Sequence, residues 1–160
     1  MHKMMKATAL MIIITIIMVS ETAMALGLAA LDKVSVHMTR AEVIALLGTP
    51  DHTDTILGGL QVEVYKVDHA APLVGTGCIY DDDGRLAGQT FLFRGEMGRD
   101  ASARMQQLGF VVTEVKEDTF RLLGKDDDTG HPLVVHIGYN NGLTVVTTFA
   151  KDFYDRRAGK

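Results

Sequence analysis

The chain has no tryptophan and only one cysteine, Cys78, among its 160 residues. A single thiol cannot form a disulfide within the chain, so the fold must be stabilised by its apolar core. With four tyrosines and no tryptophan, the sequence also argues against an aromatic platform for sugars. Cys78 lies in the segment 76–80, which has the composition of a strand. A free cysteine in such a segment is typically a small buried apolar residue, and we expect no nucleophile there.

The sequence also lacks clustered basic residues, and its formal net charge is −4. This balance argues against partners made of nucleic acid and against electrostatic docking to anionic lipid. The chain has no Gly-x-Ser-x-Gly elbow, no phosphate-binding loop and no dinucleotide fingerprint. We therefore predict that the protein is not an enzyme and uses no cofactor.

The first 25 residues have the order of a secretory signal peptide. Lys3 and Lys6 precede an apolar run of 13 residues, 7–19, and the small-residue motif 23–25 follows. At about 1.5 Å per residue this run spans about 20 Å, which is less than the roughly 30 Å core of a bilayer. The sequence thus predicts a bacterial protein that is periplasmic or secreted, cut after Ala25, with no stable membrane anchor. Retention of the leader, or a cut at another position, is the alternative.

The exported part opens with a strong helix signal over residues 39–47. Thr39 is the expected N-cap, and Glu42 at N3 completes a capping box. Gly48 is expected just after the helix, where a left-handed residue commonly ends it. We expect a polar loop at 51–59 and a strand at 60–67.

A hairpin is expected next, between strands at 77–80 and 86–93. In a three-residue loop, Gly84 would take the left-handed conformation and Asp81 would lie opposite Arg85. Phe91 and Phe93 would then share one face of their strand, and both are large enough to form part of the core.

The second half repeats the order of helix and strands. Asp100 is the expected N-cap of a helix at 101–108, and Gly109 follows it. Four strands are then expected at 110–115, 119–123, 133–139 and 143–150. Residues 152–160 are charged and are expected to form a flexible tail.

The register of the last hairpin decides which side chains face the core. A three-residue loop at 140–142 would place Ile137 opposite Val145, whereas a two-residue loop at 141–142 would place Leu143 opposite Asn140. We favour the first, because it pairs apolar with apolar residues. Leu133, Val135 and Ile137 would then face the core. The opposite face would carry Val134, His136, Thr144, Val146 and Thr148.

The order of helix, three strands, helix and four strands predicts an α+β fold in one domain, 26–151. We expect an antiparallel meander with two short helices packed on one face. The segments 34–94 and 96–151 share this order, although no residue-level repeat is convincing enough to indicate a duplication.

The segment 38–51 resembles the opening of the SmpA/OmlA family, an outer-membrane assembly lipoprotein domain, and of its β-lactamase-inhibitor-protein-like relatives. In that family a capped helix ends in a Leu-Gly-x-Pro turn, here 47–50, and a hairpin with an Asp-x-x-Gly turn follows, here 81–84. The resemblance covers residues 34–94. It implies an envelope protein that works by binding other proteins. The chain lacks the lipidated cysteine of the first branch and the cysteine pairs of the second.

Two functions follow as expectations. The first is a soluble envelope module that binds other proteins. Its candidate interaction surface consists of Val134, His136, Thr144, Val146, Thr148, Asp51, His52 and Asp54. The second is a carrier of a small molecule or lipid, with a cleft between helix and sheet. Met105, Phe91, Phe93 and Phe149 are its candidate lining, although they are more simply interpreted as core residues.

We predict no metal site. The acidic runs 81–83 and 126–128 have consecutive carboxylates, whereas a calcium loop needs alternating ones. Aspartate and glycine are also ordinary turn residues. No pair of histidines has the spacing of a zinc site.

Overall fold

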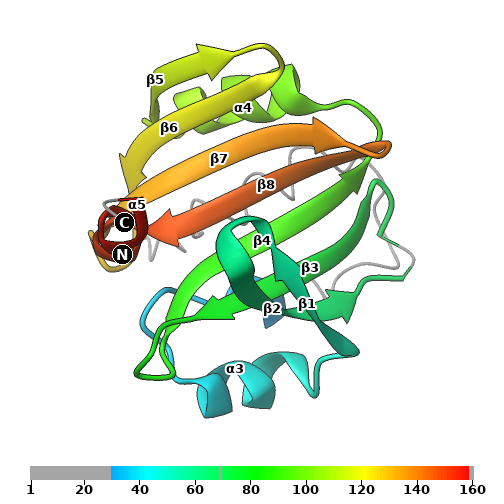
Figure 1. Cartoon of the computed structure of the whole chain (residues 1–160), viewed down its shortest axis with the longest axis vertical. Helices are drawn as coiled ribbons and strands as arrows, with labels where there is room; N and C mark the ends of the chain where they lie inside the picture. Colours follow the sequence, from blue (N-terminus) through cyan, green and yellow to red (C-terminus); the bar gives the residue numbers. More distant parts are fainter. Residues whose placement is uncertain (1–29, 69, 159–160) are drawn as a thin grey trace, which may run out of the picture.

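In the computed structural model, residues 30–158 are described, with the exception of residue 69. They form one eight-stranded antiparallel sheet with three helices, in the strand order β1-β2-β3-β4-β8-β7-β6-β5 (Figure 1). The predicted α+β class and the meander are thus confirmed. The leader at 1–25 lies outside the described residues. Within the described part of the chain, no helix has the length and apolar character needed to cross a membrane.

The sheet joins two four-stranded meanders, because β4 pairs with β8. The first half contains α3 (Arg40–Leu47), β1 (His52–Ile56), β2 (Leu60–Lys66), β3 (Leu73–Tyr80) and β4 (Leu86–Arg94). The second half contains α4 (Gly98–Gln107), β5 (Val111–Lys116), β6 (Thr119–Lys125), β7 (Pro132–Asn140), β8 (Leu143–Ala150) and α5 (Lys151–Ala158).

The capping box at the start of α3 is confirmed. The Glu42 backbone N–H donates to Thr39 Oγ1 at 3.3 Å, and the Thr39 N–H donates to Glu42 Oε2 at 2.7 Å. Gly48 ends the helix with φ 83°. The first hairpin is confirmed as well, since the Asp81 N–H donates to the Arg85 carbonyl at 2.9 Å and Gly84 has φ 73°.

The expected loop at 51–59 is wrong in its first part. Residues His52–Ile56 form β1, which pairs antiparallel with β2, so the sheet has eight strands and not seven. A one-turn 3-10 helix at Leu57–Gly59 joins the two strands. The strand is hard to predict because it lies at the edge of the sheet. Its first four side chains are exposed, so no alternation of apolar and polar residues marks it.

The second helix starts earlier than expected. Helix α4 runs from Gly98 to Gln107, and no side chain caps its N-terminus. Asp100 lies inside the first turn, where its charge is favourable beside the free N–H groups, so it resembles a cap in sequence. Ala101 and Met105 are buried as expected.

The predicted register of the last hairpin is wrong by one residue. The loop is the two-residue turn Asn141-Gly142, with φ 51° and 78°, and Leu143 lies opposite Asn140. Two left-handed residues are typical of the tight turns that suit the twist of a hairpin. Ile137 therefore lies opposite Val146, and Val145 faces the other side of the sheet.

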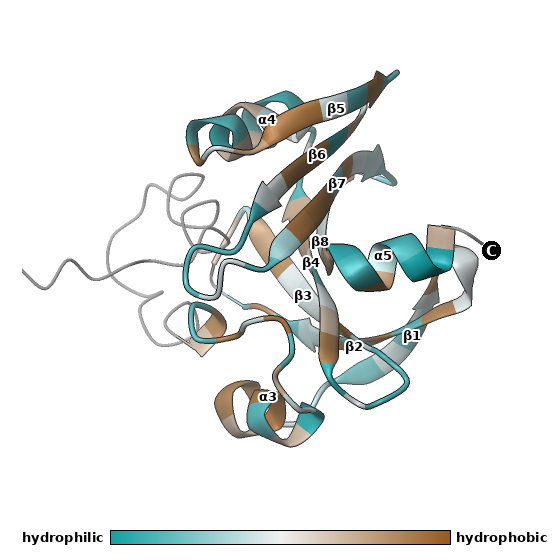
Figure 2. Ribbon diagram, turned by 90° about the vertical axis from the view of Figure 1, so that its left-hand side faces the viewer, coloured by the Kyte–Doolittle hydropathy of each residue, from teal (hydrophilic) through white to brown (hydrophobic). Residues whose placement is uncertain are grey.

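The expected tail at 152–160 is also wrong for its described residues, because Lys151–Ala158 form α5. Lys151 pairs with Asp155, and Asp152 with Arg156, at the i,i+4 spacing. Phe153 is buried against the sheet. Figure 2 shows α5 on the opposite side of the sheet from α4, so helices lie on both faces.

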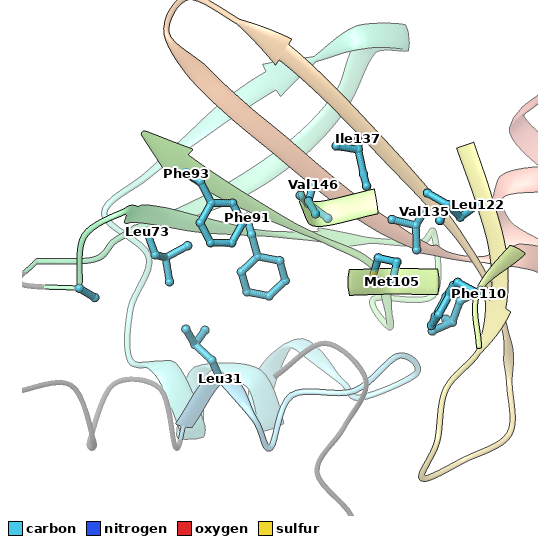
Figure 3. Close-up of a cluster of buried hydrophobic side chains, with 13 residues drawn as sticks. Leu31, Leu73, Phe91, Phe93, Met105, Phe110, Leu122, Val135, Ile137 and Val146 are labelled. Carbon is cyan, nitrogen blue, oxygen red and sulfur yellow. The ribbon is translucent and has the colours of Figure 1, made fainter. Parts of the chain in front are cut away.

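The two faces of the sheet differ in chemistry. One face, here called the Phe91 face, carries the main core, with α4 packed on it (Figure 3). One row of paired residues across it is apolar except for a threonine: Tyr65, Thr76, Phe91, Val146, Ile137 and Phe120. The adjacent row points to the other face, here called the His136 face. This row crosses all eight strands: His52, Val64, Gly77, Thr90, Thr147, His136, Arg121 and Glu114.

Candidate functional site

Polar side chains on the His136 face are linked from strand to helix. At one end of the row, Arg121 Nη2 of β6 forms an ion pair with Glu114 Oε2 of β5 at 2.6 Å. Arg121 Nη1 also donates to the Tyr154 hydroxyl of α5 at 3.4 Å. The guanidinium therefore connects the edge of the sheet to the helix that lies over it.

His136 of β7 lies beneath α5. Its ring centroid is 5.2 Å from that of Tyr154 and 6.3 Å from that of Phe149. Nε2 is buried and has no hydrogen-bond partner among the described residues. Burial, and secondarily the charge of Arg121, lower the pKa of His136. The structure thus favours a neutral imidazole in apolar surroundings.

A cleft of about 630 Å³ opens on this face between α5 and the sheet. Its walls are mainly apolar and aromatic, and the four strands β1, β2, β7 and β8 and the helix α5 contribute to them. The lining residues are Ile56, Gly58, Leu60, His136, Thr147, Phe149, Phe153, Tyr154, Arg157 and Ala158. A mainly apolar cleft of several hundred Å³ with a few polar groups is the usual form of a small-molecule site.

Two aromatic rings give the cleft a rigid wall. Phe149 of β8 and Phe153 of α5 are stacked, with centroids 6.2 Å apart. Arg157 lies one turn further along α5, and its Cζ is 5.5 Å from the centroid of the Phe153 ring. Its Nη2 is also 3.9 Å from Asp82 Oδ1 in the acidic turn between β3 and β4. Arg157 therefore lies between an apolar cleft and an acidic turn.

The candidate interaction surface does not form one surface. Val134 and His136 point to the His136 face, but Val134 is buried with 1% exposure. Thr144, Val146 and Thr148 are buried on the Phe91 face. Their placement was wrong because the register was shifted by one residue. Thr144 is accommodated there because its hydroxyl accepts from the Met97 N–H and donates to the Gly95 carbonyl, each at 2.7 Å.

Asp51, His52 and Asp54 lie at the β1 edge of the sheet, separated from β7 and β8 by β2, β3 and β4. All three are exposed, and His52 and Asp54 belong to β1. Asp51 Oδ2 accepts from the Lys66 N–H, and Asp54 Oδ1 from the Thr55 N–H, each at 2.7 Å. These bonds fix the local backbone. Among the described residues, no group of three histidine, cysteine, aspartate or glutamate side chains is placed to hold a metal ion.

Of the side chains proposed for a carrier cleft, only Phe149 lines the cleft. Phe91, Phe93 and Met105 belong to the core of the Phe91 face (Figure 3). Met105 borders a void there of about 20 Å³, with room for about one water molecule. The large apolar residues are thus divided between core and cleft.

Cys78 is fully buried on the Phe91 face, as expected. It packs in a cluster with Val43 of α3 and Tyr65. Burial raises the pKa of the Cys78 thiol to about 12. The thiol is therefore protonated at neutral pH and is poorly suited to nucleophilic chemistry.

Sequence reasoning found His136 and Phe149 but missed Arg121, Tyr154 and Arg157. The signal for α5 was present in the alternating charges of Lys151, Asp155, Asp152 and Arg156, whose i,i+4 spacing is helical. Arg121 gave no comparable signal, because its partners are separated from it in sequence.

Comparison with known protein families, with curated proteins and with solved structures gave no match for this chain. The SmpA/OmlA resemblance over residues 34–94 therefore stays a prediction.

Proposed function

We propose that the protein is a non-catalytic binding protein of the bacterial envelope, and that it holds an apolar ligand in the cleft between α5 and the His136 face. The observation that carries this proposal is the cleft itself, with its aromatic wall and its few polar groups. Export rests on the predicted leader. This function corresponds to the carrier expectation, which the cleft favours over the protein-binding one.

Several features of the wall are suited to holding a ligand. His136 is held neutral, and its neighbours are aromatic rings and an arginine that is already paired with Glu114. The Thr147 hydroxyl is hydrogen-bonded to that of Thr90 at 3.0 Å. Of these polar groups, His136 Nε2 has no hydrogen-bond partner among the described residues, so it can orient a ligand.

Filling the cleft tests the proposal. Ala158 lines the cleft at the exposed end of α5, so Ala158→Trp should place a ring in it and leave the core intact. Ala103→Trp is a matched control, because Ala103 is exposed on α4, which packs on the other face. We expect the neutral dye phenylnaphthylamine to fluoresce with the wild type and Ala103→Trp, and to lose most of its binding with Ala158→Trp. Equal binding by all three proteins would contradict the proposal.

One observation favours a protein partner as a second candidate. Strand β5 is a free edge of the sheet, and its Val111 and Val115 side chains are 63% and 59% exposed. An open edge with apolar side chains is suited to pairing with a strand of another protein. Capture of a protein from envelope extract that is lost in Val111→Lys/Val115→Lys, and retained in Ala158→Trp, would support this function over the first.

A further inference from the structure

The charges around the cleft define its ligand more closely. Among the described residues that line it, Arg157 is the only one with a formal charge at neutral pH, and no carboxylate is present. His136 and Thr147 are the other polar side chains of the lining that lie on the sheet. The cleft thus combines an apolar interior with one positive charge on α5.

Arg157 is positioned to hold an anion. Its guanidinium lies over the Phe153 ring, a contact that orients the planar group. Its one ion pair with a described residue, Asp82 at 3.9 Å, is long, and the Asp82 side chain is fully exposed. An exposed ion pair of this length contributes little to stability. The N–H donors of Arg157 are therefore available to a stronger acceptor.

We infer that the cleft binds a single-chain amphiphile with a carboxylate head, whose carboxylate pairs with Arg157 while its apolar chain lies against Phe149 and Phe153. This inference depends on the proposed function of the cleft. A guanidinium matches a carboxylate through two parallel hydrogen bonds, and the stacked rings provide the apolar surface.

The ligand is a dissolved monomer and not a membrane surface. The cleft is bounded by α5 on one side and by the β1–β2 hairpin, through Ile56 and Leu60, on the other, so it accepts a chain and not a flat surface. The net charge of −4 also opposes approach to anionic lipid.

Two variants of the pair Arg157–Asp82 should act in opposite directions. Arg157→Gln removes the cation and should weaken binding of dodecanoate about tenfold, while binding of dodecanol stays unchanged. Asp82→Asn removes the competing carboxylate and should strengthen dodecanoate binding. Arg156→Gln is the matched control, because Arg156 pairs with Asp152 and does not line the cleft.

The experiment is calorimetric titration of the purified protein with dodecanoate and dodecyltrimethylammonium below their micelle concentrations and with dodecanol below its solubility limit. We expect dodecanoate to bind tightest and the ammonium weakest. If dodecanoate and dodecanol bind equally and Arg157→Gln changes neither, the carboxylate inference is overturned and the cleft remains a site for apolar ligands. If none of the three binds, the proposed function fails with it. Binding to phosphatidylglycerol vesicles without binding to monomeric dodecanoate would also overturn the inference.

Discussion

The hydroxyl groups of Thr90 and Thr147 lie 3.0 Å apart where β4 pairs with β8, at the junction of the two halves of the sheet. The two residues are 57 positions apart, directly opposite each other, and both are buried. Each belongs to the last strand of its half, and in each half a helix comes before the last strand of a four-stranded meander. The pair thus lies at the seam between the two meanders.

This pair predicts a non-additive pattern of stability. Thr90→Val or Thr147→Val leaves the other hydroxyl buried without its partner, which should cost about 1 to 3 kcal/mol. Replacing both removes the unsatisfied group, so the double variant should be more stable than the sum of the single effects implies. Urea unfolding of the four proteins measures this coupling. Additive losses would show that the two hydroxyls do not stabilise each other.

The capping box predicts a local loss of stability. Thr39→Ala removes the acceptor for the Glu42 N–H and should lower the free energy of unfolding by about 1 kcal/mol. Thr39→Ser retains the hydroxyl and is the control. The hydrogen bond from the Thr39 backbone N–H, and then the one from its side chain, lower the pKa of Glu42. The stabilisation by the capping box is therefore lost at acidic pH, when this carboxylate is protonated. Coincident thermal melts of the alanine and serine variants would contradict this role.

The observed register reverses which valine of β8 tolerates a charge. Val146 has 0% exposure in the core of the Phe91 face, so Val146→Asp should bury an unpaired carboxylate and cost several kcal/mol. Val145 is half-buried on the His136 face, so Val145→Asp should cost much less. Urea unfolding compares the two. A larger loss for Val145→Asp would support the three-residue loop expected from the sequence.

Local signals were enough to predict most of the sheet and the two helices α3 and α4. The capping box at Thr39 and the turn glycine Gly84 act through neighbours a few residues away, so they are visible in a single sequence. The register of the last hairpin was not visible in the sequence, because the apolar pattern of β8 is interrupted by buried threonines. Thr144 satisfies its hydroxyl with backbone from the segment before α4, a contact across 47 positions.

The candidate site was less predictable than the fold. Its cleft joins the β1–β2 hairpin, the central strands and α5, and no local pattern indicates that these three come together. Strand β1 was hidden by its exposed polar residues, whereas the charges of α5 have the i,i+4 spacing of a helix. His136 was identified from its place in a half-polar strand face, but its partners Tyr154 and Arg121 come from other elements.

Cys78 should be unreactive in the folded protein. It is fully buried, and burial raises the pKa of its thiol to about 12, so neither access nor ionisation favours attack. We expect iodoacetamide to label Cys78 only when denaturant unfolds the chain, with a rate that follows the unfolded fraction. Rapid labelling without denaturant would show that the cluster beneath α3 opens in the native state.

His136 predicts how stability depends on pH. Its folded pKa is lowered, first by burial and then by the charge of Arg121, so the unfolded chain binds the proton more tightly. The stabilising contribution is therefore complete above the ordinary pKa of 6.5 and is lost as pH falls through the lowered folded value. Arg121, Glu114 and Tyr154 are the ionisable groups around the ring, and only the carboxylate favours its protonation.

The measurement is urea unfolding at neutral pH and at about pH 5, where an unperturbed histidine is mostly charged. The wild type should lose more stability on acidification than His136→Gln, whose side chain does not titrate. Because the ring packs against Tyr154 and Phe149, protonation should also loosen α5. Hydrogen exchange in Lys151–Ala158 should then accelerate at acidic pH in the wild type more than in the variant. An equal acid response in both proteins would assign the effect to other groups.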